Sequence, residues 1–385
     1  MVSDEELLQR YPAISDLARL AKRRMPHFAW EFLDSGTGED VSKARNRSRF
    51  DAVTLTPRFM QGEFAPELST ELFGSEYSAP FGIAPVGMNS LAWPGTDRIL
   101  ARTAARHRIP YSMSTAANET IENLGKLADG MGWFQLYPPR NPNMRVDLLA
   151  RAREAGFTTL LVTVDVPVIS RRERQMRAGV GGGFRLSPSM VWQCMTRPQW
   201  SMATVSEGKP RLPSLERYSP TDDLQTFLAF VGEELNGTFD WSYVDSIRNE
   251  WDGPMVLKGI MSAADAQEAV RRGVDGIMVS NHGGRQLDGA PASIEVLPEI
   301  AGAVGGQARI ILDSGVRGGM DIARSLALGA DFVMLGRAFM FGAAALGERG
   351  GEHTARLLRT DLSNVMSNLG CRDVASLRDR VASAG

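Results

Sequence analysis

Short apolar runs alternate with helical patterns along most of the chain from residue 80 onward. Each run has five to seven residues, too few for a buried helix, and most are rich in the Val, Ile, Leu and Phe residues typical of a strand buried on both faces. The predicted strands are Phe81–Val86, Ile109–Ser114, Trp133–Tyr137, Thr159–Asp165, Pro254–Ile260, Gly276–Asn281, Arg309–Asp313 and Phe332–Gly336.

Helical patterns separate most of these strands, for example at Arg98–His107, Arg145–Ala155, Ala263–Arg272 and Gly319–Leu328. Eight strands alternating with helices predict an α/β fold, a (β/α)8 TIM barrel, at about residues 80–345. A doubly wound open sheet fits the same alternation and is the alternative. Helices are also predicted in the first 50 residues, the second of them beginning at Pro26 and ending near Ser35. We expect a single domain over residues 1–385.

One interval, between the fourth and fifth predicted strands, breaks this rhythm. It contains a long loop at about residues 173–250, with a glycine-rich turn at Gly179–Gly183. Loops of this length are usually functional or mobile. Apolar side chains gather in it at Phe184, Leu186, Met190, Val191, Trp192, Met195, Trp200 and Met202, beside Arg185, Arg197 and Arg211. The loop is either a lid or subunit contact, or a peripheral membrane contact made through residues 179–219.

Composition and charge limit the possible partners and location of the protein, but they do not indicate a reaction. The 43 basic and 45 acidic residues nearly cancel, so charge gives no argument for binding nucleic acid. Cys194 and Cys371 have no metal-ligand or redox spacing and suit a reducing compartment. The N-terminus lacks a signal-peptide pattern, and no apolar run is long enough to span a bilayer. We therefore expect a cytoplasmic protein, either soluble or peripheral on the inner face of the membrane.

Polar residues stand at the ends of six consecutive predicted strands, from the third to the eighth. The carboxyl ends of the strands form the active site of a barrel, so these residues are candidates for chemistry. They are Gln135 and Tyr137, Thr163 and Asp165 followed by Arg172, Lys258, Ser280 followed by His282 and Arg285, Asp313 followed by Gly315 and Arg317, and Gly336 with Arg337.

The last two strand ends predict a phosphate site. Gly315 and Gly336 let backbone N–H groups come close to a ligand, and Arg317 and Arg337 supply paired positive charge. The chain has no Walker-type loop and no strand-associated Gly-x-Gly-x-x-Gly, which argues against a nucleoside triphosphate or a Rossmann-bound dinucleotide.

His282 is the candidate proton acceptor. It follows an apolar strand, lies between glycine and asparagine, and a buried carboxylate such as Asp165 would stabilise its charged form. No second histidine or cysteine lies at ligand spacing, so we reject a metal site here.

Lys258 and two arginines complete the candidate set. Only five of the 43 basic residues are lysines, so a lysine that ends a strand indicates a specific amine or point charge in the site. A Schiff-base aldolase lysine is the competing interpretation. Arg172 and Arg285 indicate an anionic substrate, because two guanidinium groups match a carboxylate.

The segment Ser280-Asn-His-Gly-Gly-Arg-Gln-Leu-Asp288 resembles a signature of the FMN-dependent enzymes that oxidise 2-hydroxy acids. That family includes glycolate oxidase, lactate oxidase and the bacterial L-lactate and (S)-mandelate dehydrogenases. The likeness extends from about residue 10 to residue 375. The segments Trp251–Ile260 and Leu335–Met340, with Trp93-Pro94, look most like the bacterial membrane-associated members.

The resemblance implies a role for each candidate residue. His282 removes a proton from the substrate, Asp165 stabilises its imidazolium, Arg172 and Arg285 bind the carboxylate, and Tyr137 hydrogen-bonds the reacting end. Lys258 lies beside the flavin. The flavin ring would contact Pro85, Val86, Gly87, Ser114, Gln135, Thr163 and Ser280, and the ribityl phosphate would contact Asp313, Gly315, Arg317, Gly336 and Arg337.

Two substrate-binding positions set this chain apart. The family usually has a tyrosine on the substrate carboxylate where this chain has Phe32, and glycolate oxidase has a bulky tryptophan where this chain has Ala116. Gly87 matches the bacterial dehydrogenases. Together these residues predict a substrate larger than glycolate, either mandelate-like or lactate-like.

The predicted function is FMN-dependent oxidation of an (S)-2-hydroxy acid to the 2-oxo acid, with electrons passing to a quinone, another carrier or O2. An FMN-dependent isomerase, or an aldolase acting on a phosphorylated substrate, is the alternative for the same barrel. The resemblance also implies a homotetramer.

Overall fold

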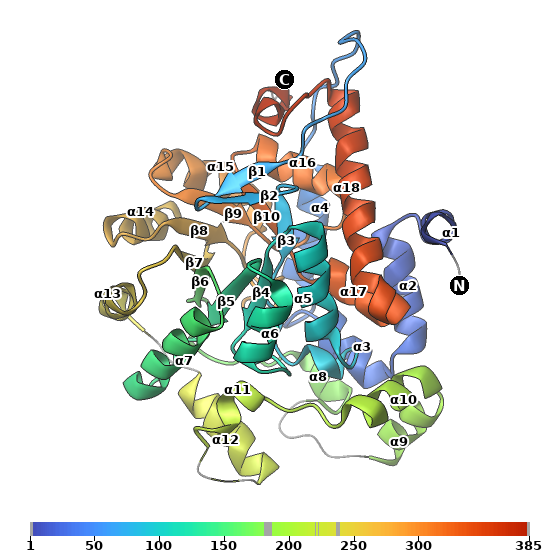
Figure 1. The fold of residues 1–385 in the computed structure, drawn as a ribbon, viewed down its shortest axis with the longest axis vertical. Helices are drawn as coiled ribbons and strands as arrows, with labels where there is room; N and C mark the ends of the chain where they lie inside the picture. The colour runs from blue at the N-terminus through green and yellow to red at the C-terminus, as the bar shows by residue number, and fades with distance from the viewer. Residues whose placement is uncertain (1–2, 181–186, 220, 222, 236–238, 383–385) are drawn as a thin grey trace.

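Eight parallel strands close into a barrel in the computed structural model, which describes residues 3–180, 187–219, 221, 223–235 and 239–382. Each strand overlaps a run predicted from the sequence, and β10 pairs with β3 to close the sheet, so the TIM-barrel prediction is confirmed and the open sheet is excluded (Figure 1). Around the barrel the strands are β10 (Phe332–Leu335), β3 (Phe81–Ile83), β4 (Tyr111–Ser114), β5 (Gly132–Leu136), β6 (Thr159–Thr163), β7 (Met255–Ile260), β8 (Gly276–Val279) and β9 (Arg309–Leu312).

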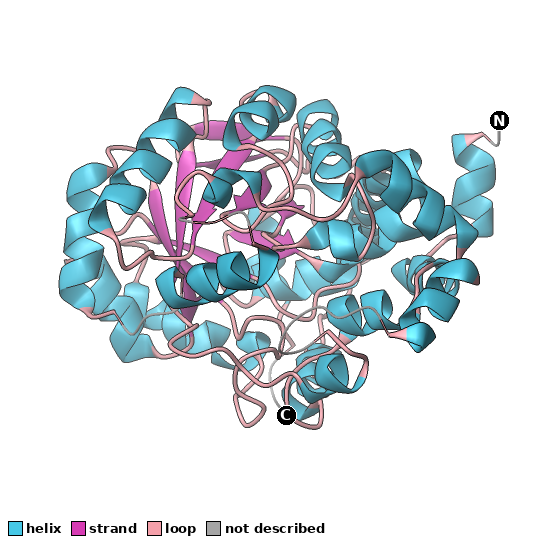
Figure 2. Ribbon diagram, turned by 90° about the horizontal axis from the view of Figure 1, so that it is seen from below, coloured by secondary structure: helices cyan, strands magenta, loops and turns pink. Residues whose placement is uncertain are grey.

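Helices enclose the barrel, which explains why its strands are apolar on both faces (Figure 2). These helices are α5 (Thr96–His107), α6 (Ile121–Ala128), α7 (Pro142–Glu154), α14 (Ala263–Arg271), α15 (Ser293–Val304), α16 (Gly319–Ala327), α17 (Arg337–Leu346) and α18 (Gly350–Leu369). The short 3-10 turns are η1 (Asn89–Leu91), η2 (Gly347–Arg349) and η3 (Ala375–Arg380).

The described residues before the barrel are mostly helical, as predicted, but they form four helices where the sequence delimited only one, from Pro26 to near Ser35. They are α1 (Asp4–Arg10), α2 (Ile14–Arg24), α3 (His27–Asp34) and α4 (Val41–Asp51). α2 packs its buried face, which includes Leu17 and Ala21, against α17. α3 ends beside the loops that follow β8 and β10, since its last carbonyls accept hydrogen bonds from Arg285 and Arg337. The N-terminal segment therefore reaches the carboxyl end of the barrel.

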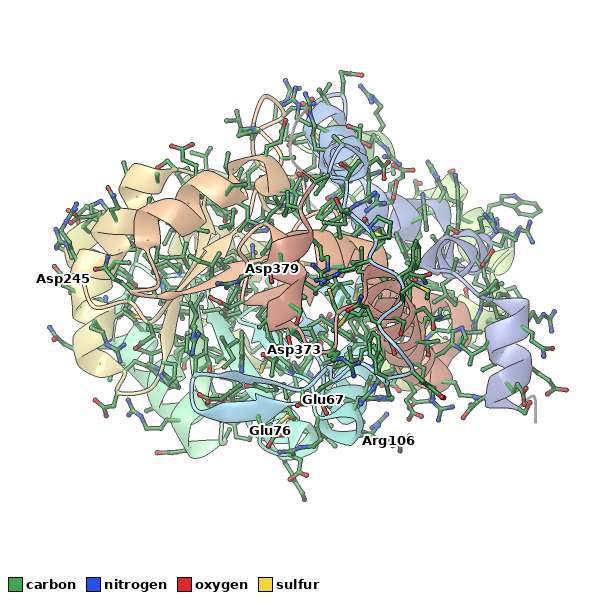
Figure 3. The ribbon with its side chains drawn as sticks, turned by 90° about the horizontal axis from the view of Figure 1, so that it is seen from above. Glu67, Glu76, Arg106, Asp245, Asp373 and Asp379 are labelled. Atoms are coloured by element: carbon green, nitrogen blue, oxygen red, sulfur yellow. The ribbon has the colours of Figure 1, made fainter. Side chains whose placement is uncertain are left out.

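A hairpin that the sequence did not predict closes the amino end of the barrel. Its strands are β1 (Thr70–Leu72) and β2 (Ser75–Tyr77). The Tyr77 ring packs against Phe332 and Trp133, and the Trp133 indole donates to the Tyr77 hydroxyl at 3.0 Å. Just before the hairpin, Glu67 forms a β-bridge with Asp373, and Figure 3 shows these two residues on neighbouring segments of this end.

The interval between β6 and β7 is largely helical, where the sequence predicted a loop. Prolines at the first helical position begin three of its helices, and aspartates cap two others. The helices in its described part are α8 (Glu173–Arg177), α9 (Pro188–Met195), α10 (Pro198–Glu207), α11 (Pro213–Glu216), α12 (Leu224–Glu234) and α13 (Trp241–Glu250). α9 to α12 lie at the edge opposite the β1–β2 hairpin (Figure 1). Phe184, Arg185, Leu186 and residues 181–183 of the predicted glycine-rich turn lie outside the described residues.

Candidate active site

A cleft of about 250 Å³ opens at the carboxyl end of the barrel, between α3 and the loops that follow the strands. It brings together most of the site residues predicted from the sequence. Those that line it are Phe32, Pro85, Val86, Gly87, Ala116, Tyr137, Arg172, Lys258, His282, Arg285, Asp313, Gly315, Arg317, Gly336 and Arg337. Sequence reasoning missed other lining residues, among them Leu33, Ala84, Ser314, Met334 and Leu335.

Five predicted residues do not line the cleft, and three of them, Ser114, Ser280 and Asp165, contact residues that do. Gln135 donates to the Thr163 hydroxyl at 2.9 Å, and both side chains are buried between neighbouring strands. Ser114 accepts a hydrogen bond from the backbone N–H of Ala116, at 3.2 Å. Ser280 accepts a hydrogen bond from the Lys258 ammonium at 3.0 Å. The fifth residue, Asp165, lies behind His282.

His282 is held between an acid and a phenol. Its Nδ1 lies 3.0 and 3.2 Å from the two carboxylate oxygens of Asp165, and its Nε2 lies 3.4 Å from the Tyr137 hydroxyl. Burial lowers the pKa of His282, although Asp165 opposes this shift. Burial also raises the pKa of Tyr137, so the phenol stays protonated. The imidazole is therefore neutral at neutral pH, with Nδ1 facing the acid and Nε2 facing the cleft.

Two residues that sequence reasoning did not single out hold Asp165 in place. Gly259 sits at a bulge in β7 with φ +108°, and a Cβ there would lie 2.5 Å from the Asp165 Cβ. Only glycine gives Asp165 this space. Gln286, four residues after His282, donates to the Asp165 carbonyl at 3.1 Å. In the sequence, the close contact between Gly259 and Asp165 is indicated only by a glycine that directly follows Lys258 at the end of a predicted strand.

Five cationic side chains face the cleft. Lys258 lies 3.4 Å from Asp313; burial lowers its pKa, but the carboxylates of Asp313 and Asp165 outweigh burial, and the net pKa is raised. Burial lowers the pKa of the remaining four cations, Arg172, Arg285, Arg317 and Arg337, that of Arg317 to about 9. Lys258 is therefore charged at neutral pH, and arginine side chains keep their charge in proteins, so the cleft is lined by positive charge.

None of these four guanidinium groups has a carboxylate oxygen within 4.0 Å among the residues that the structure describes. All four are half-buried, and cations withdrawn from water without acidic partners are costly unless an anion joins them. Arg317 and Arg337 lie by the amino end of α17, whose backbone N–H groups also favour a phosphate. At Gly336 a Cβ would meet only Val86 and Ala84, at 3.5 and 3.9 Å, so this side of the cleft is open.

Gly315 has a second reason to be glycine. Its φ is +96°, and a Cβ there would lie 2.6 Å from the Asn46 carbonyl of α4. The sequence argument attributed this glycine to a close approach of the ligand, whereas the structure shows that packing against α4 already requires it. Asp313, two residues earlier, remains buried beside Lys258.

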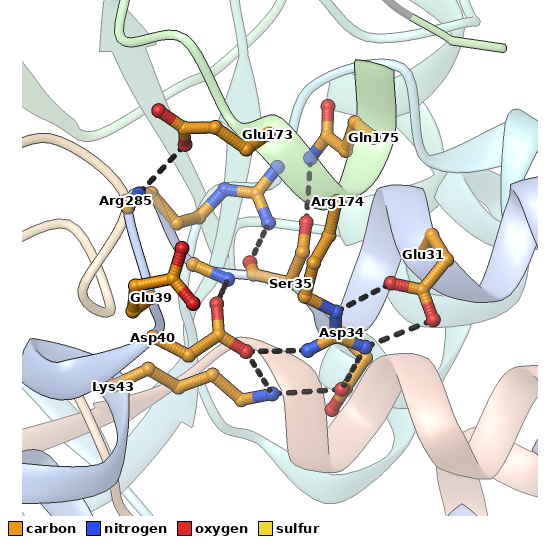
Figure 4. Close-up of polar contacts among 12 residues, drawn as sticks. Glu31, Asp34, Ser35, Glu39, Asp40, Lys43, Glu173, Arg174, Gln175 and Arg285 are labelled. Atoms are coloured by element: carbon orange, nitrogen blue, oxygen red, sulfur yellow. Dashed lines mark hydrogen bonds and ion pairs between the residues drawn. The ribbon is translucent and has the colours of Figure 1, made fainter. Parts of the chain in front are cut away.

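The end of α3 orients two of the cleft arginines. Arg285 donates to the Ser35 carbonyl at 2.8 Å (Figure 4) and to the Phe32 carbonyl at 3.2 Å. Arg337 donates to the carbonyls of Ser35 (2.9 Å) and Leu33 (3.1 Å). The last carbonyls of a helix have no partner within it and carry partial negative charge, so they attract guanidinium groups. The Phe32 ring also lines the cleft, with its centroid 5.9 Å from the Arg285 guanidinium carbon.

The fold and the cleft define a barrel enzyme with a base for proton transfer and with sites for a phosphate and for a second anion. The apolar wall formed by Ala84, Pro85, Val86, Met334 and Leu335, next to the phosphate-binding arginines, fits a flat ring carried on a phosphorylated chain. The donor set of the cleft therefore suits a flavin mononucleotide.

Comparison with known proteins agrees with this geometry. Residues 21–384 match the FMN-dependent dehydrogenase family. The chain is 39% identical to the L-lactate dehydrogenase of Xanthomonas axonopodis pv. citri (strain 306) and 37% identical to that of Pseudomonas entomophila (strain L48), over 95% of this chain and 94% and 96% of those proteins.

Solved structures give the same result. A crystal structure of the monotopic membrane protein (S)-mandelate dehydrogenase superposes with a TM-score of 0.92 at 34% identity, covering 97% of this chain and 99% of that one. A mandelate oxidase structure with benzoyl-formic acid gives 0.83 at 32% identity, covering 97% and 99%. The chain belongs to the FMN-dependent dehydrogenase family, and its cofactor is FMN. The family and the cofactor predicted from the sequence are confirmed.

Proposed function

We propose that this FMN-dependent dehydrogenase oxidises an (S)-2-hydroxy acid to the corresponding 2-oxo acid. The observation that carries the proposal is His282, which is backed by Asp165 and shares one cleft with Tyr137 and with two arginines that have no carboxylate partner among the described residues. A base next to a carboxylate-binding pair suits removal of a proton from a hydroxy acid. The L-lactate and (S)-mandelate dehydrogenases that this chain resembles are named for substrates of that class.

Each residue of the cleft has one task in this reaction. Arg172 and Arg285 bind the substrate carboxylate, and Tyr137 donates a hydrogen bond to the reacting end. His282 accepts a proton at Nε2, and Asp165 stabilises the imidazolium through Nδ1. FMN, when bound, supplies the two-electron acceptor.

The residues proposed to hold FMN form two groups, one for the flavin ring and one for the phosphate. Lys258 would hold a buried positive charge beside the flavin ring and so favour its reduced, anionic form. The ring would lie against Pro85, Val86 and Gly87, which line the cleft. We assign Ser114, Gln135, Thr163 and Ser280 to the ring as well, as buried side chains of the strand ends that lie outside the cleft lining. The phosphate would contact Asp313, Gly315, Arg317, Gly336 and Arg337.

Phe32 and Ala116 shape the substrate side of the cleft. Both line it, and neither offers a side-chain hydrogen bond to a carboxylate. Ala116 lies close to Gly87, since a Cβ at Gly87 would come 3.1 Å from the Ala116 Cβ. Two small residues side by side leave room for an aryl or long alkyl substituent, so the proposed substrate is larger than glycolate.

The test is anaerobic mixing of the purified holoenzyme with glycolate, lactate, mandelate and long-chain 2-hydroxy acids in both enantiomers, followed by flavin absorbance. Bleaching by an (S)-acid larger than glycolate supports the proposal. A yellow protein that none of these acids bleaches refutes it.

A Schiff-base aldolase is the other chemistry that a barrel lysine suggests. An amine must be neutral to attack a carbonyl, and enzymes achieve this by lowering the lysine pKa. Here the pKa of Lys258 is raised, and its ammonium is bound by Ser280 and Asp313. The structure therefore favours an electrostatic role for Lys258.

The electron acceptor and the oligomeric state are further parts of the proposal. We favour a quinone or another carrier over O2, and a homotetramer, as the resemblance implies. Comparing reoxidation of the reduced enzyme by air and by a soluble quinone tests the acceptor: faster reoxidation by air indicates an oxidase. Light scattering on the eluted protein tests the tetramer.

We also propose that α9 and α10 contact a membrane surface. Trp192, Met195 and Met202 are 62–65% exposed and Val205 is 85% exposed, while Met190 and Trp200 of the same helices are buried against the protein. Such a two-sided pair of helices suits the interface of a bilayer. No helix in the described part of the chain has the length and apolar character to cross one.

Vesicle sedimentation tests the membrane contact. Replacing Trp192, Met195 and Met202 by serine should reduce binding to phosphatidylglycerol-containing vesicles. Replacing Phe59 and Met60, exposed apolar residues in the segment between α4 and β1, is the matched control and should leave binding unchanged. Equal binding by both variants and the parent protein refutes the contact.

A further inference from the structure

The five-residue helix α8 begins directly after the cleft residue Arg172, and its first three side chains all bind the segment from α3 to α4. Glu173 accepts a hydrogen bond from the Gly38 N–H at 2.8 Å. Gln175 donates to the Ser35 hydroxyl at 3.0 Å and to the Phe32 carbonyl at 3.2 Å. Between them, Arg174 enters a cluster of acids (Figure 4). So short a helix has little stability of its own, and these contacts set its position.

Arg174 makes the strongest of these contacts. It binds both carboxylate oxygens of Glu31, at 2.6 and 2.9 Å, lies 3.2 Å from Asp34, and also pairs with Asp40. Lys43 joins the same cluster at 2.7 Å from Asp34. A planar guanidinium group suits such multiple pairing, which a lysine ammonium cannot reproduce.

The charges of this cluster reinforce one another. Burial raises the pKa of Asp34, but Lys43, Arg337 and Arg174 outweigh it and hold the pKa below its usual value. The pKa of Asp40 is lowered in the same way, mainly by Arg174 against the effect of burial. Asp34 and Asp40 therefore stay ionised at neutral pH and keep their ion pairs with Arg174.

The cluster holds the segment that carries Arg172. Arg172 has φ +48°, a left-handed conformation that costs about 1 kcal/mol for a residue with a Cβ and persists only where its surroundings enforce it. Its Nε donates to the Ser170 hydroxyl at 3.2 Å, and Ser170 donates to the Arg285 carbonyl. Arg285 in turn donates to Ser35 and Phe32. Both cleft arginines therefore rest on the same turn after α3.

We propose that Arg174 is a positioning residue for substrate binding: by tying α8 to the α3–α4 segment, it fixes the Arg172 guanidinium relative to that of Arg285. The inference rests on the proposed function, in which these two arginines bind the substrate carboxylate. Arg174 does not line the cleft and acts only through Arg172. Asp165, which contacts His282, is positioned by two other residues: Gln286 donates to its carbonyl, and Gly259 leaves space for its side chain. Ser170 links Gln286 to the Arg172 segment through one hydrogen bond of 3.3 Å.

The test compares Arg174→Ala and Arg174→Lys with the control Arg272→Ala in the holoenzyme. Arg272 is matched to Arg174, since it also bridges two carboxylates, Asp245 and Glu268, and is 32% exposed against 29%. Oxalate is titrated into each oxidised enzyme and its Kd read from flavin absorbance. The KM of the best hydroxy acid, the limiting rate of flavin bleaching and the unfolding temperature are measured alongside.

Loss of Arg174 should raise the oxalate Kd and the KM by about 10-fold to 100-fold, as expected when a binding group is displaced by about an ångström. The limiting rate should change far less, Arg174→Lys should recover part of the affinity, and Arg272→Ala should change neither constant. A lower unfolding temperature with unchanged Kd and KM overturns the inference, as does an equal rise in the control. Failure of the parent enzyme to bind oxalate or to be bleached by any hydroxy acid overturns the proposed function itself.

Discussion

Replacing Asp165 by Asn removes the charge that faces His282 while keeping the shape of the side chain. The two groups are 3.0 Å apart. At an effective dielectric constant of about 20, an imidazolium and a carboxylate at that separation attract each other by about 5.5 kcal/mol. A hydrogen bond to a charged group makes a net contribution of about 1.5–3 kcal/mol, and we take this as the lower bound of the stabilisation that is lost. The loss corresponds to a rate of proton removal that is about 10-fold to 10⁴-fold lower.

The pH profile of this variant has a defined sign. Asp165 opposes the effect of burial on the pKa of His282, so its removal lowers that pKa further. Since the base must be neutral to act, the acidic limb of the rate profile should move to lower pH while the plateau falls. The assay is anaerobic stopped-flow bleaching of the flavin, at saturating hydroxy acid, over a range of pH. FMN content and unfolding temperature serve as controls for the fold.

Two outcomes would refute this reasoning. One is a plateau rate within about threefold of the parent enzyme, which corresponds to less than about 1 kcal/mol. The other is an acidic limb that moves to higher pH, which would mean that Asp165 does not stabilise the protonated imidazole.

Three further substitutions test the other parts of the site. Gly259→Ala should displace Asp165 and lower the rate of flavin bleaching at least about 10-fold. The control is Gly273→Ala, where φ is +74° and no atom lies within 4 Å of the new Cβ. This control should cost only about 1–3 kcal/mol of stability, measured by denaturant titration, and leave the bleaching rate unchanged. Phe32→Tyr should lower the KM of small hydroxy acids by about 10-fold or more through a hydrogen bond worth about 1.5–3 kcal/mol; an unchanged order of substrates would contradict the role given to Phe32. Arg317→Ala should lower the affinity for FMN by about 10-fold or more, measured by fluorescence of the released flavin. It should leave the affinity for riboflavin unchanged, because riboflavin has no phosphate. An equal loss of affinity for both flavins would contradict a phosphate-binding role for Arg317.

The barrel and most of its site were predictable because both depend on local patterns. Strands buried on both faces are visible as short apolar runs, and barrel geometry places whatever follows them at one end. This rule alone predicts that His282, Lys258 and Arg337 lie close together, and the structure places all three in one cleft. The single-domain organisation and the oligomeric state remain predictions.

The parts that were missed depend on contacts between distant segments. The sequence does not show that Gly259 makes room for Asp165, because the clash arises only when β6 and β7 pair. The helices between β6 and β7 were hidden by their short length and by prolines, which indicate a loop as readily as a helix start. The Arg174 cluster was missed because its acids lie more than 130 residues away in sequence.

The end of α3 has a consequence for how the enzyme is made. Its carbonyls emerge from the ribosome early, yet the arginines that they orient follow 250 residues later for Arg285 and 302 residues later for Arg337. Because chains are synthesised from the N-terminus, α3 must wait for nearly the whole barrel before it finds its partners. Completion of the phosphate site therefore coincides with closure of the barrel, and a nascent chain released before β10 is formed lacks Gly336 and Arg337.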